Sequence, residues 1–240
     1  MAERAKIRLY IDAALGAGQS VNLSRDHAHY LGNVMRQDIG ALVALFNGRD
    51  GEWTGTLESL SKKSATVQCE DQTAPQTDPP DLWMLFAPIK KTRTDFIVEK
   101  AAELGAAYIQ PVQTEFTNAE RIRQPRLQAH AIEAAEQCGG TFVPKVADLQ
   151  KLSKVLDHWN PARRILFCDE TQAGQDLAFP KKAGPWAILI GPEGGFSDRE
   201  LARLRGADFI SSISLGPRIL RADTAAVAAL SLWQSKLGDW

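Results

Sequence analysis

The sequence has few cysteines and no long apolar run. Cys69, Cys138 and Cys168 are odd in number and far apart in the 240 residues, so they form neither a disulfide framework nor a CxxC metal site. No stretch of about 18 apolar residues could cross a membrane, and the N-terminus lacks the apolar core of a signal peptide. These absences predict a protein of the reducing cytoplasm with no membrane partner.

The chain also lacks an excess of positive charge. It has 28 Lys and Arg against 29 Asp and Glu, a net charge of -1, which excludes a protein that coats nucleic acid with a wholly basic surface. The charge balance does not exclude a local basic patch. The four histidines show no metal-ligand spacing, so we predict no metal site. With 44% hydrophobic residues, the chain can bury a hydrophobic core without disulfides or metal ions to stabilise it.

One segment separates two patterns of hydrophobicity. Asp71–Asp81 (DQTAPQTDPPD) holds three prolines and no large apolar residue, which is typical of a linker; a surface loop within one domain is the alternative. We therefore predict a domain over residues 1–74, a linker over 75–81 and a second domain over 82–240.

The first domain reads as mainly β-structure. Ile7–Ile11 alternates as a strand, Ala41–Phe46 is an apolar run that precedes two turn dipeptides, and alternating strands follow at Trp53–Leu60 and Ala65–Cys69. A helix is expected over Ser24–Met35, with Ser24 as its cap. Short strands with turns between them predict a small β-barrel or sandwich.

The second domain alternates between strands and helices. Strands are expected at Leu82–Ala87, Ala107–Val112, Arg164–Cys168, Trp186–Ile190 and Phe209–Leu215, and helices at Thr94–Leu104 and Arg126–Cys138. A last helix carries Ala226, Leu230, Trp233 and Leu237 on one face, which suits either core or an interface. The alternation predicts an α/β fold with a mainly parallel sheet, in which ligands bind at the carboxyl ends of strands.

The first candidate loop follows the strand Trp186–Ile190. It reads Gly191-Pro192-Glu193-Gly194-Gly195, and Ser197 with Glu200 then has the spacing of a capping box. Glycines let a ligand approach the backbone closely, although a sharp turn would use them too. The loop matches neither GxGxxG nor GxxxxGK[ST], so the usual phosphate cradles are not supported.

The second candidate loop follows the strand Phe209–Leu215. It offers Arg218 and Arg221, with Asp223 next as the expected cap of the last helix. Two guanidinium groups at a strand end suit phosphates or negative charge that develops on a base. A pair of ordinary solvated charges is the alternative.

Together, the two loops resemble those of the ribosomal RNA small subunit methyltransferase E family, within the SPOUT superfamily of knotted RNA methyltransferases. That family has GPEGG before a capped helix and LGxRILRxET after a later strand; this chain has Gly191–Gly195 and Leu215–Thr224 (LGPRILRADT). Further similarity lies at Arg8–Tyr10, HYLGNVMR (29–36), EKAAELG (99–105), IQP (109–111) and AAEQCGG (134–140). The resemblance covers essentially the whole chain.

The resemblance implies a fold, a cofactor and a reaction. The expected fold is a C-terminal α/β SPOUT domain with a deep trefoil knot and a small N-terminal PUA-like β-barrel that binds RNA. The expected reaction transfers methyl from S-adenosylmethionine (SAM) to N3 of a uridine in 16S ribosomal RNA of the small subunit, near the decoding centre. The family is dimeric, which implies a homodimer through the C-terminal domain.

The resemblance also assigns residues. Arg218 and Arg221 are the expected catalytic residues, and the base is Glu193, Asp223 or water. Cofactor contacts are expected from Phe167, Glu170, Ile190, Gly191, Pro192, Glu193, Gly194, Gly195, Leu215, Gly216, Ile219, Leu220 and Arg221. The RNA contacts expected are Arg8, Arg25, Arg36, Lys90, Lys91 and Arg93.

Three positions depart from the family pattern. Asp223 stands where glutamate is usual, and Phe116 and Gly140 stand where arginine is common. We expect the two missing arginines to weaken RNA contacts near the linker without touching the cofactor motifs. Two other functions stay open: a SPOUT methyltransferase of the ribose 2′-oxygen, and a catalytically silent RNA-binding assembly factor. The first is disfavoured because such enzymes carry an SLNV segment where this chain has Ile219–Asp223.

Overall fold

The computed structural model describes residues 5–118, 121–175, 179–180 and 183–240. Its contacts divide the chain into two compact units, Met1–Asp78 with Ala135–Val143, and Pro79–Ala134 with Pro144–Trp240. The division falls after Asp78, inside the proline-containing segment. The return of Ala135–Val143 to the first unit is a long-range feature that no local pattern in the sequence marks.

The first unit is built on one five-stranded sheet. Its strands are β1 (Ile7–Tyr10), β2 (Ser20–Leu23), β3 (Leu42–Phe46), β4 (Glu52–Leu60) and β5 (Ala65–Ala74). They pair in the order β1-β3-β4-β5-β2, in parallel between β1 and β3 and antiparallel elsewhere. The small β domain is therefore present, with its ladder open between β1 and β2 in the described pairing. β5 runs through the first four residues of the segment Asp71–Asp81 and ends at Ala74.

A short helix covers one end of this sheet. α1 (Arg25–His29) begins at Ser24, whose side chain accepts a hydrogen bond from the His27 amide, as predicted. The helix does not continue in α form to Met35, because Tyr30–Val34 winds as a π-helical turn. Leu31 on that turn and Ala28 of α1 are buried in the core with residues from all five strands, so burial of these side chains anchors the insert to the sheet.

The second unit holds a larger, wholly parallel sheet. Its strands are β6 (Leu82–Phe86), β7 (Tyr108–Gln113), β8 (Lys145–Val146), β9 (Gln150–Lys151), β10 (Arg164–Cys168), β11 (Trp186–Ile190) and β12 (Ile210–Ile213). The order is β12-β10-β11-β6-β7-β8, and β9 also pairs with β7. Every described pair is parallel. The predicted mainly parallel α/β sheet is thus confirmed.

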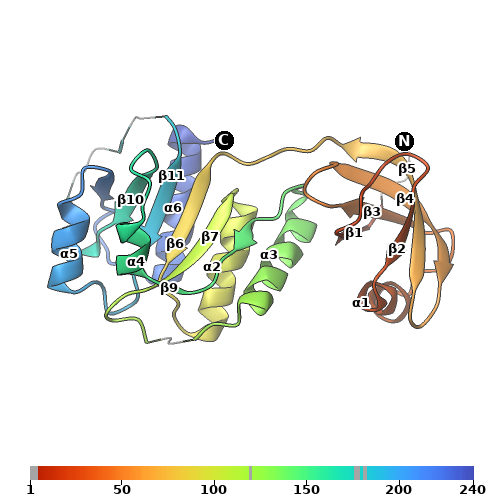
Figure 1. Cartoon of the computed structure of the whole chain (residues 1–240), viewed down its shortest axis with the longest axis horizontal. Helices are drawn as coiled ribbons and strands as arrows, with labels where there is room; N and C mark the ends of the chain where they lie inside the picture. The colour runs from red at the N-terminus through yellow and green to blue at the C-terminus, as the bar shows by residue number, and fades with distance from the viewer. Residues whose placement is uncertain (1–4, 119–120, 176–178, 181–182) are drawn as a thin grey trace. The chain divides into compact units, whose positions relative to one another are not determined.

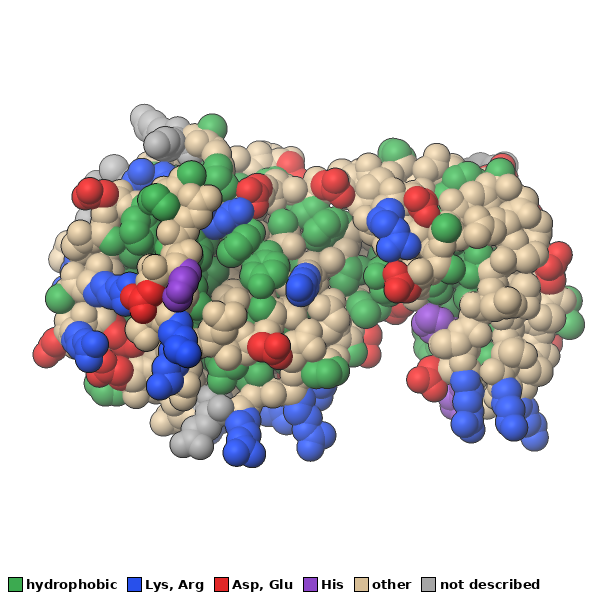
Figure 2. Space-filling view, in the orientation of Figure 1, with side chains coloured by type: hydrophobic (Ala, Val, Ile, Leu, Met, Phe, Trp, Pro, Cys, Tyr) green, Lys and Arg blue, Asp and Glu red, His purple; other side chains and the backbone are tan. Residues whose placement is uncertain are grey.

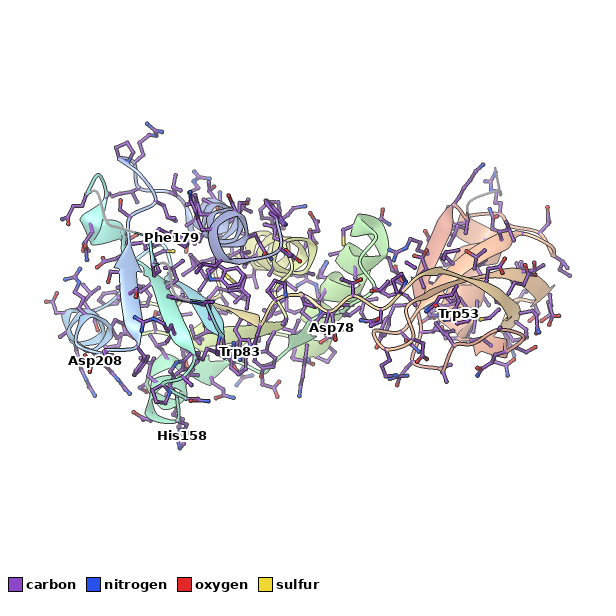
Figure 3. The ribbon with its side chains drawn as sticks, turned by 90° about the horizontal axis from the view of Figure 1, so that it is seen from above. Trp53, Asp78, Trp83, His158, Phe179 and Asp208 are labelled. Atoms are coloured by element: carbon purple, nitrogen blue, oxygen red, sulfur yellow. The ribbon has the colours of Figure 1, made fainter. Side chains whose placement is uncertain are left out.

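Helices cover both faces of this sheet (Figures 1 and 3). On one face, α4 (Leu152–Asp157) and α5 (Asp198–Arg205) add Leu152, Leu156 and Leu204 to a core with side chains of β6, β7, β10 and β11. On the other face lie α2 (Lys91–Glu103) and α6 (Ala222–Leu237), while α3 (Gln124–Cys138) follows β7 in the chain. Both faces are covered, which explains why β11 is apolar at every position and buried throughout.

The apolar face of α6 belongs to the core of the chain. Ala226, Leu230 and Trp233 are buried within the second unit, and Leu237 is partly buried. This face was expected to form either part of the core or an interface, and in the structure it packs in the core. No helix among the described residues is long and apolar enough to span a bilayer.

Candidate functional site

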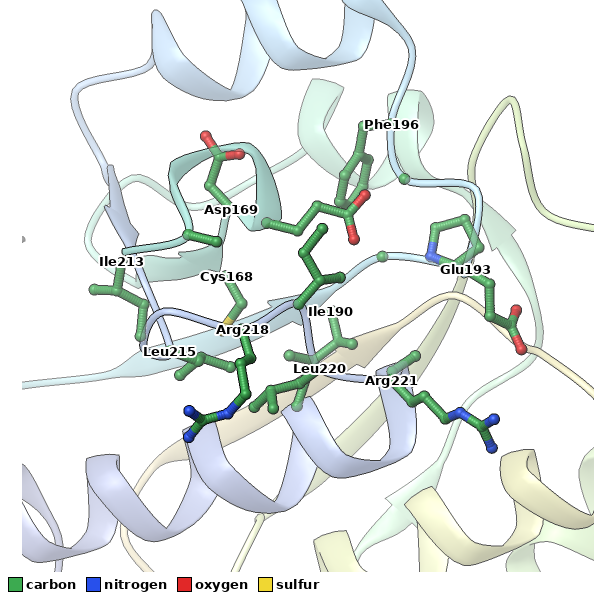
Figure 4. A pocket seen from close by; sticks show the side chains of 18 of the residues that line it. Cys168, Asp169, Ile190, Glu193, Phe196, Ile213, Leu215, Arg218, Leu220 and Arg221 are labelled. Atoms are coloured by element: carbon green, nitrogen blue, oxygen red, sulfur yellow. The ribbon is translucent and has the colours of Figure 1, made fainter. Parts of the chain in front are cut away.

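Strand order brings three loops together at one edge of the parallel sheet. β10 lies between β12 and β11, with Cys168 opposite Ile213 and Phe167 opposite Leu189. Because parallel strands end at the same edge, the loops after all three strands converge there. They enclose a pocket that has Ile190, Ile213 and Leu220 among its apolar lining residues (Figure 4).

Most of the residues predicted to hold a cofactor line this pocket. Those present are Glu170, Ile190, Gly191, Pro192, Glu193, Gly195, Leu215, Gly216, Ile219, Leu220 and Arg221, together with the predicted catalytic Arg218. Phe167 and Gly194 are absent from the lining. Phe167 is fully buried and meets Phe196 edge to face, with ring centroids 5.2 Å apart. It supports the pocket from behind, because Phe196 itself lines it.

The glycine-rich loop is shaped by close contacts that exclude side chains. A Cβ on Gly191 would lie 2.5 Å from the Phe196 ring, and one on Gly195 would lie 2.4 Å from Oε1 of Glu170. Gly195 also has φ of +69°, a left-handed conformation that glycine adopts without steric cost. The loop therefore requires glycine for its own geometry as well as for the approach of a ligand.

The capping box predicted after this loop is confirmed. The Ser197 hydroxyl accepts from the Glu200 amide, and the Glu200 carboxylate accepts from the Ser197 amide, so α5 begins at Asp198. The other Glu200 oxygen accepts from the amide of Glu115, 3.0 Å away. One carboxylate thus fixes the start of α5 and ties it to the segment after β7.

Two neighbouring carboxyl groups beside the pocket differ in electrostatics. Asp169 is buried, and burial alone would raise its pKa; hydrogen bonds from Thr171, Arg205 and Gln172 outweigh that penalty and hold the pKa below its usual range. Burial, and then the charge of Asp169, raises the pKa of Glu170. Asp169 therefore anchors the loop as an anion at neutral pH, whereas Glu170 reaches over Gly195 into the pocket wall.

The two predicted catalytic arginines are exposed on the pocket rim. Both come from the loop between β12 and α6, and Figure 4 shows their side chains diverging from the segment that carries Leu220. Within the described part of the chain, neither makes an ion pair. Arg221, not Asp223, is the N-cap residue of α6, so that cap prediction was wrong. Asp223 instead pairs with Arg93 at 3.7 Å.

Several pocket residues were missed by sequence reasoning. They are Ala173, Phe196, Ile213, Ala222 and Ala225. Most of them lie within a few positions of the predicted segments, so the ends of the strands could have indicated them. Nothing in the sequence indicated Ala225, because it enters the pocket one helical turn into α6. Cys168 and Asp169 also line the pocket, within the strand end Phe167–Glu170 that the resemblance assigned to the cofactor. Burial raises the pKa of the Cys168 thiol, which makes it a poor nucleophile at neutral pH.

Arg8 does not face solvent as its predicted RNA contact requires. Its side chain is 16% exposed, pairs with Glu52 at 2.5 Å and lies over the Phe46 ring. Its remaining donors bind the carbonyl oxygens of Ala135, Glu136 and Gly140, at the end of α3. These partners occupy the guanidinium inside the first unit, so we withdraw Arg8 as an RNA contact.

The other predicted RNA contacts lie on two units. Arg25 and Arg36 are exposed on the first, and Arg36 has a φ of 50°, unusual for a residue with a side chain. Lys90 and Lys91 are exposed at the start of α2 on the second, whereas Arg93 is partly buried by its pairing with Asp223. Among the described residues, no group of three or more His, Cys, Asp or Glu is placed to hold a metal ion.

Comparison with protein families gives two matches. A model described as an RNA methyltransferase domain matches residues 63–234, and one described as an RNA methyltransferase PUA domain matches residues 23–69. Among curated relatives, ribosomal RNA small subunit methyltransferase E of Rickettsia conorii is 29% identical over 230 residues, covering 93% of each chain. The chain belongs to the ribosomal RNA small subunit methyltransferase E family.

Solved structures of the family share the whole architecture. The methyltransferase E of Neisseria gonorrhoeae, bound to S-adenosyl methionine, superposes with a TM-score of 0.88 at 29% identity and covers 98% of this chain and 99% of its own. A putative methyltransferase of Legionella pneumophila, in complex with SAM, gives 0.87 at 31% identity, covering 99% and 100%. The chain therefore has the SPOUT α/β fold with an N-terminal PUA-like domain. The trefoil knot stays a prediction.

The departures from the family pattern fall in two different places. Gly140 lies near the linker segment, as expected: its carbonyl binds Arg8, and the next residue, Thr141, accepts a hydrogen bond from the amide of Thr77. Phe116 does not. A Cβ on Gly194 would lie 3.3 Å from the Cβ of Phe116, so Phe116 touches the cofactor loop, and the expectation that it would not was wrong.

Proposed function

We propose that this chain is a SAM-dependent methyltransferase that modifies N3 of a uridine in 16S ribosomal RNA, in the decoding region of the small subunit. The observation that supports it most is the convergence of the GPEGG loop and the LGPRILR loop on one pocket of a fold whose relatives carry SAM in solved structures. The substrate class follows the names of those relatives.

The chemistry of the pocket lining suits SAM. Ile190, Leu215 and Leu220 provide apolar surface for the faces of an adenine ring, and the backbone of the glycine loop can bind its polar edge. The carboxylates of Glu170 and Glu193 suit the positive charge of a sulfonium. When bound, SAM supplies an electrophilic methyl group beside these residues.

The two rim arginines are the proposed catalytic residues. Arg218 and Arg221 line the pocket and stay exposed, so both guanidinium groups are available to a base that enters from solvent. They orient the uracil through its carbonyl oxygens and stabilise the negative charge that develops when N3 loses its proton.

The structure favours one of the candidate bases. Asp223 is engaged with Arg93 and does not line the pocket. Glu193 is exposed and lines it. We therefore assign the N3 proton to Glu193, or to a water that it orients, in preference to Asp223.

Two measurements on the purified chain test this function. Calorimetry is expected to show SAM binding at a single site, and incubation of 16S rRNA with SAM is expected to yield N3-methyluridine by mass spectrometry. Methyl on a ribose 2′-oxygen would support the alternative SPOUT reaction. Neither heat nor methyl transfer would support the silent assembly factor.

The assembly state and location belong to the same proposal. We propose a homodimer through the C-terminal domain, acting on the small ribosomal subunit in the cytoplasm. Because Ala226, Leu230 and Trp233 pack inside the chain, the dimer contact falls to exposed residues of α6 such as Leu232. Sedimentation of Leu232→Asp against the wild type tests this, with a shift to monomer expected.

A further inference from the structure

Three adjoining hollows surround α4 on the second unit. The first lies between the end of β7 and the start of α5, and it shares Gln113 and Lys151 with the second. The second shares Gln150 and Lys154 with the third, which lies at the amino half of β6. Neighbouring hollows therefore adjoin one another at shared lining residues along α4, and we call the row of three the α4 groove.

Basic side chains without ion-pair partners line this groove. Lys151, Lys154, Arg121 and Arg199 are all exposed, and none makes a salt bridge to any other described residue. β9 pairing fixes Lys151 opposite Gln113 of β7. Figure 2 shows Lys and Arg side chains on the face of this unit around the place where Figure 1 draws α4 and β9. In a chain of net charge -1, such a local concentration is a candidate anion surface.

The acidic residues of the groove do not cancel these charges. Glu200 accepts hydrogen bonds from two backbone amides, and Asp157 is paired with Arg203 at 2.7 Å. Glu115 and Asp148 are exposed in the hollows and have no ion-pair partner among the described residues. Glu200 has no ion-pair partner among the described residues either, so three carboxylates (Glu115, Asp148 and Glu200) stand against four unpaired cations along the groove. The remaining excess of positive charge favours a polyanion.

The two ends of the groove favour RNA over an acidic protein. At the far end, Trp83 and Trp159 meet edge to face, and the Arg163 guanidinium lies 4.0 Å from the Trp83 ring centroid. The Arg163 guanidinium is itself engaged, since it is 13% exposed and pairs with Asp81 at 2.7 Å. The partly exposed rings of Trp83 and Trp159 are the surfaces offered to bases at this end, because aromatic planes stack on bases. At the near end, Phe116 follows Glu115, is 49% exposed and contacts the Gly194 segment of the cofactor loop.

We propose that the α4 groove binds a single-stranded segment of the ribosomal RNA substrate and leads it to the cofactor pocket. Lys151, Lys154, Arg121 and Arg199 contact its phosphates. This inference rests on the proposed function for the identity of the RNA, but the groove itself is separate from the cofactor pocket. None of these residues was among the RNA contacts expected from the sequence.

The test measures RNA affinity apart from methyl transfer. We would compare the wild type, the double variant Lys151→Ala/Lys154→Ala, and Lys145→Ala as a control that removes an exposed lysine of β8. Binding of 16S rRNA is followed without SAM over a range of salt concentrations. The double variant is expected to bind about ten-fold more weakly, and each phosphate deprived of its lysine should reduce the slope of log affinity against log salt by about 0.7. The control is expected to match the wild type.

Activity and competition separate the possible outcomes. The double variant is expected to raise KM for RNA while kcat and SAM affinity stay at wild-type values. Unchanged RNA affinity and salt slope would overturn the groove even if the wild type methylates RNA. Competition by poly-glutamate as effective as that by RNA would also overturn it, since the surface would then accept any polyanion. A wild type that binds RNA through the groove but transfers no methyl would instead refute the proposed function.

Discussion

Gly195 is constrained by its own backbone and by its neighbour. It combines a φ of +69° with a position where a Cβ would meet the Glu170 carboxylate at 2.4 Å. We expect Gly195→Ala to displace Glu170 and lower SAM affinity by at least ten-fold in calorimetry. Gly139 is the matched control, because it has φ of +82° but open space around its Cβ position. Gly139→Ala should cost about 1 kcal/mol of stability and leave SAM affinity unchanged; equal losses of affinity in both variants would contradict this reading.

Asp169 links pH to stability at the same site. Its pKa is below its usual range in the folded chain, so its stabilisation is fully present above the unfolded pKa of about 3.9 and is lost as pH falls through the folded value. Asp169→Asn should therefore be destabilised at neutral pH, and its difference from the wild type should shrink below about pH 4. Urea unfolding between pH 3 and 7 measures this. A pH-independent difference would contradict it; Asp38→Asn, at an exposed position, serves as the control.

Arg8 is predicted to stabilise the fold and to contribute nothing direct to RNA binding. Arg8→Ala leaves the buried side of Glu52 and three carbonyl oxygens at the end of α3 without their donor. Loss of charged hydrogen bonds of this kind costs about 3 kcal/mol, measurable by denaturant unfolding. A stable variant with weakened RNA affinity would restore Arg8 as an RNA-binding residue.

The start of α5 is the element whose geometry most directly shapes the pocket. Ser197→Ala removes half of the capping box and is expected to cost about 1 kcal/mol of stability. Because the cap follows the glycine loop directly, SAM affinity should fall several-fold as well. Thermal unfolding and calorimetry would show both effects. Ser59→Ala, at an exposed position of β4, should change neither quantity, and a Ser197→Ala variant with full SAM affinity would separate the cap from the pocket.

Elements were predictable where hydrophobicity alone decides them. β10 (Arg164–Cys168) and β11 (Trp186–Ile190) have the predicted bounds. Each is a short run of mainly apolar residues, which is the pattern of a strand covered by helices on both faces of its sheet. β8, β9 and α4 were missed because elements of two and six residues are too short to show a period. The π-helical turn at Tyr30–Val34 was missed because its periodicity differs little from that of a helix.

The candidate site was predictable only in part, because it depends on strand order. The glycine loop and the arginine loop each stand out in the sequence, and both line the pocket. Their proximity requires β10 to lie between β12 and β11, and no local pattern contains that order. The family resemblance supplied only the expectation that both loops contact one cofactor. Phe116 shows the same limit, since its contact with Gly194 joins segments far apart in the chain.

At the scale of the whole molecule, the residues of the cofactor pocket and the residues proposed to bind RNA are distributed differently over the two units. The cofactor pocket is made by loops of the second unit alone, whereas the exposed cations proposed for RNA lie on both units. A nearly neutral chain should therefore depend on local surfaces for RNA affinity, with a strong response to salt.

We propose that the pocket between the two loops delivers methyl to N3 of a uridine. The most direct measurement is nucleoside mass spectrometry of 16S rRNA after incubation with the chain and methyl-labelled SAM, beside Arg221→Ala. We predict labelled N3-methyluridine with the wild type and a rate lowered about 100-fold in the variant. Label on a ribose 2′-oxygen, no label at all, or an unchanged rate in the variant would contradict the account.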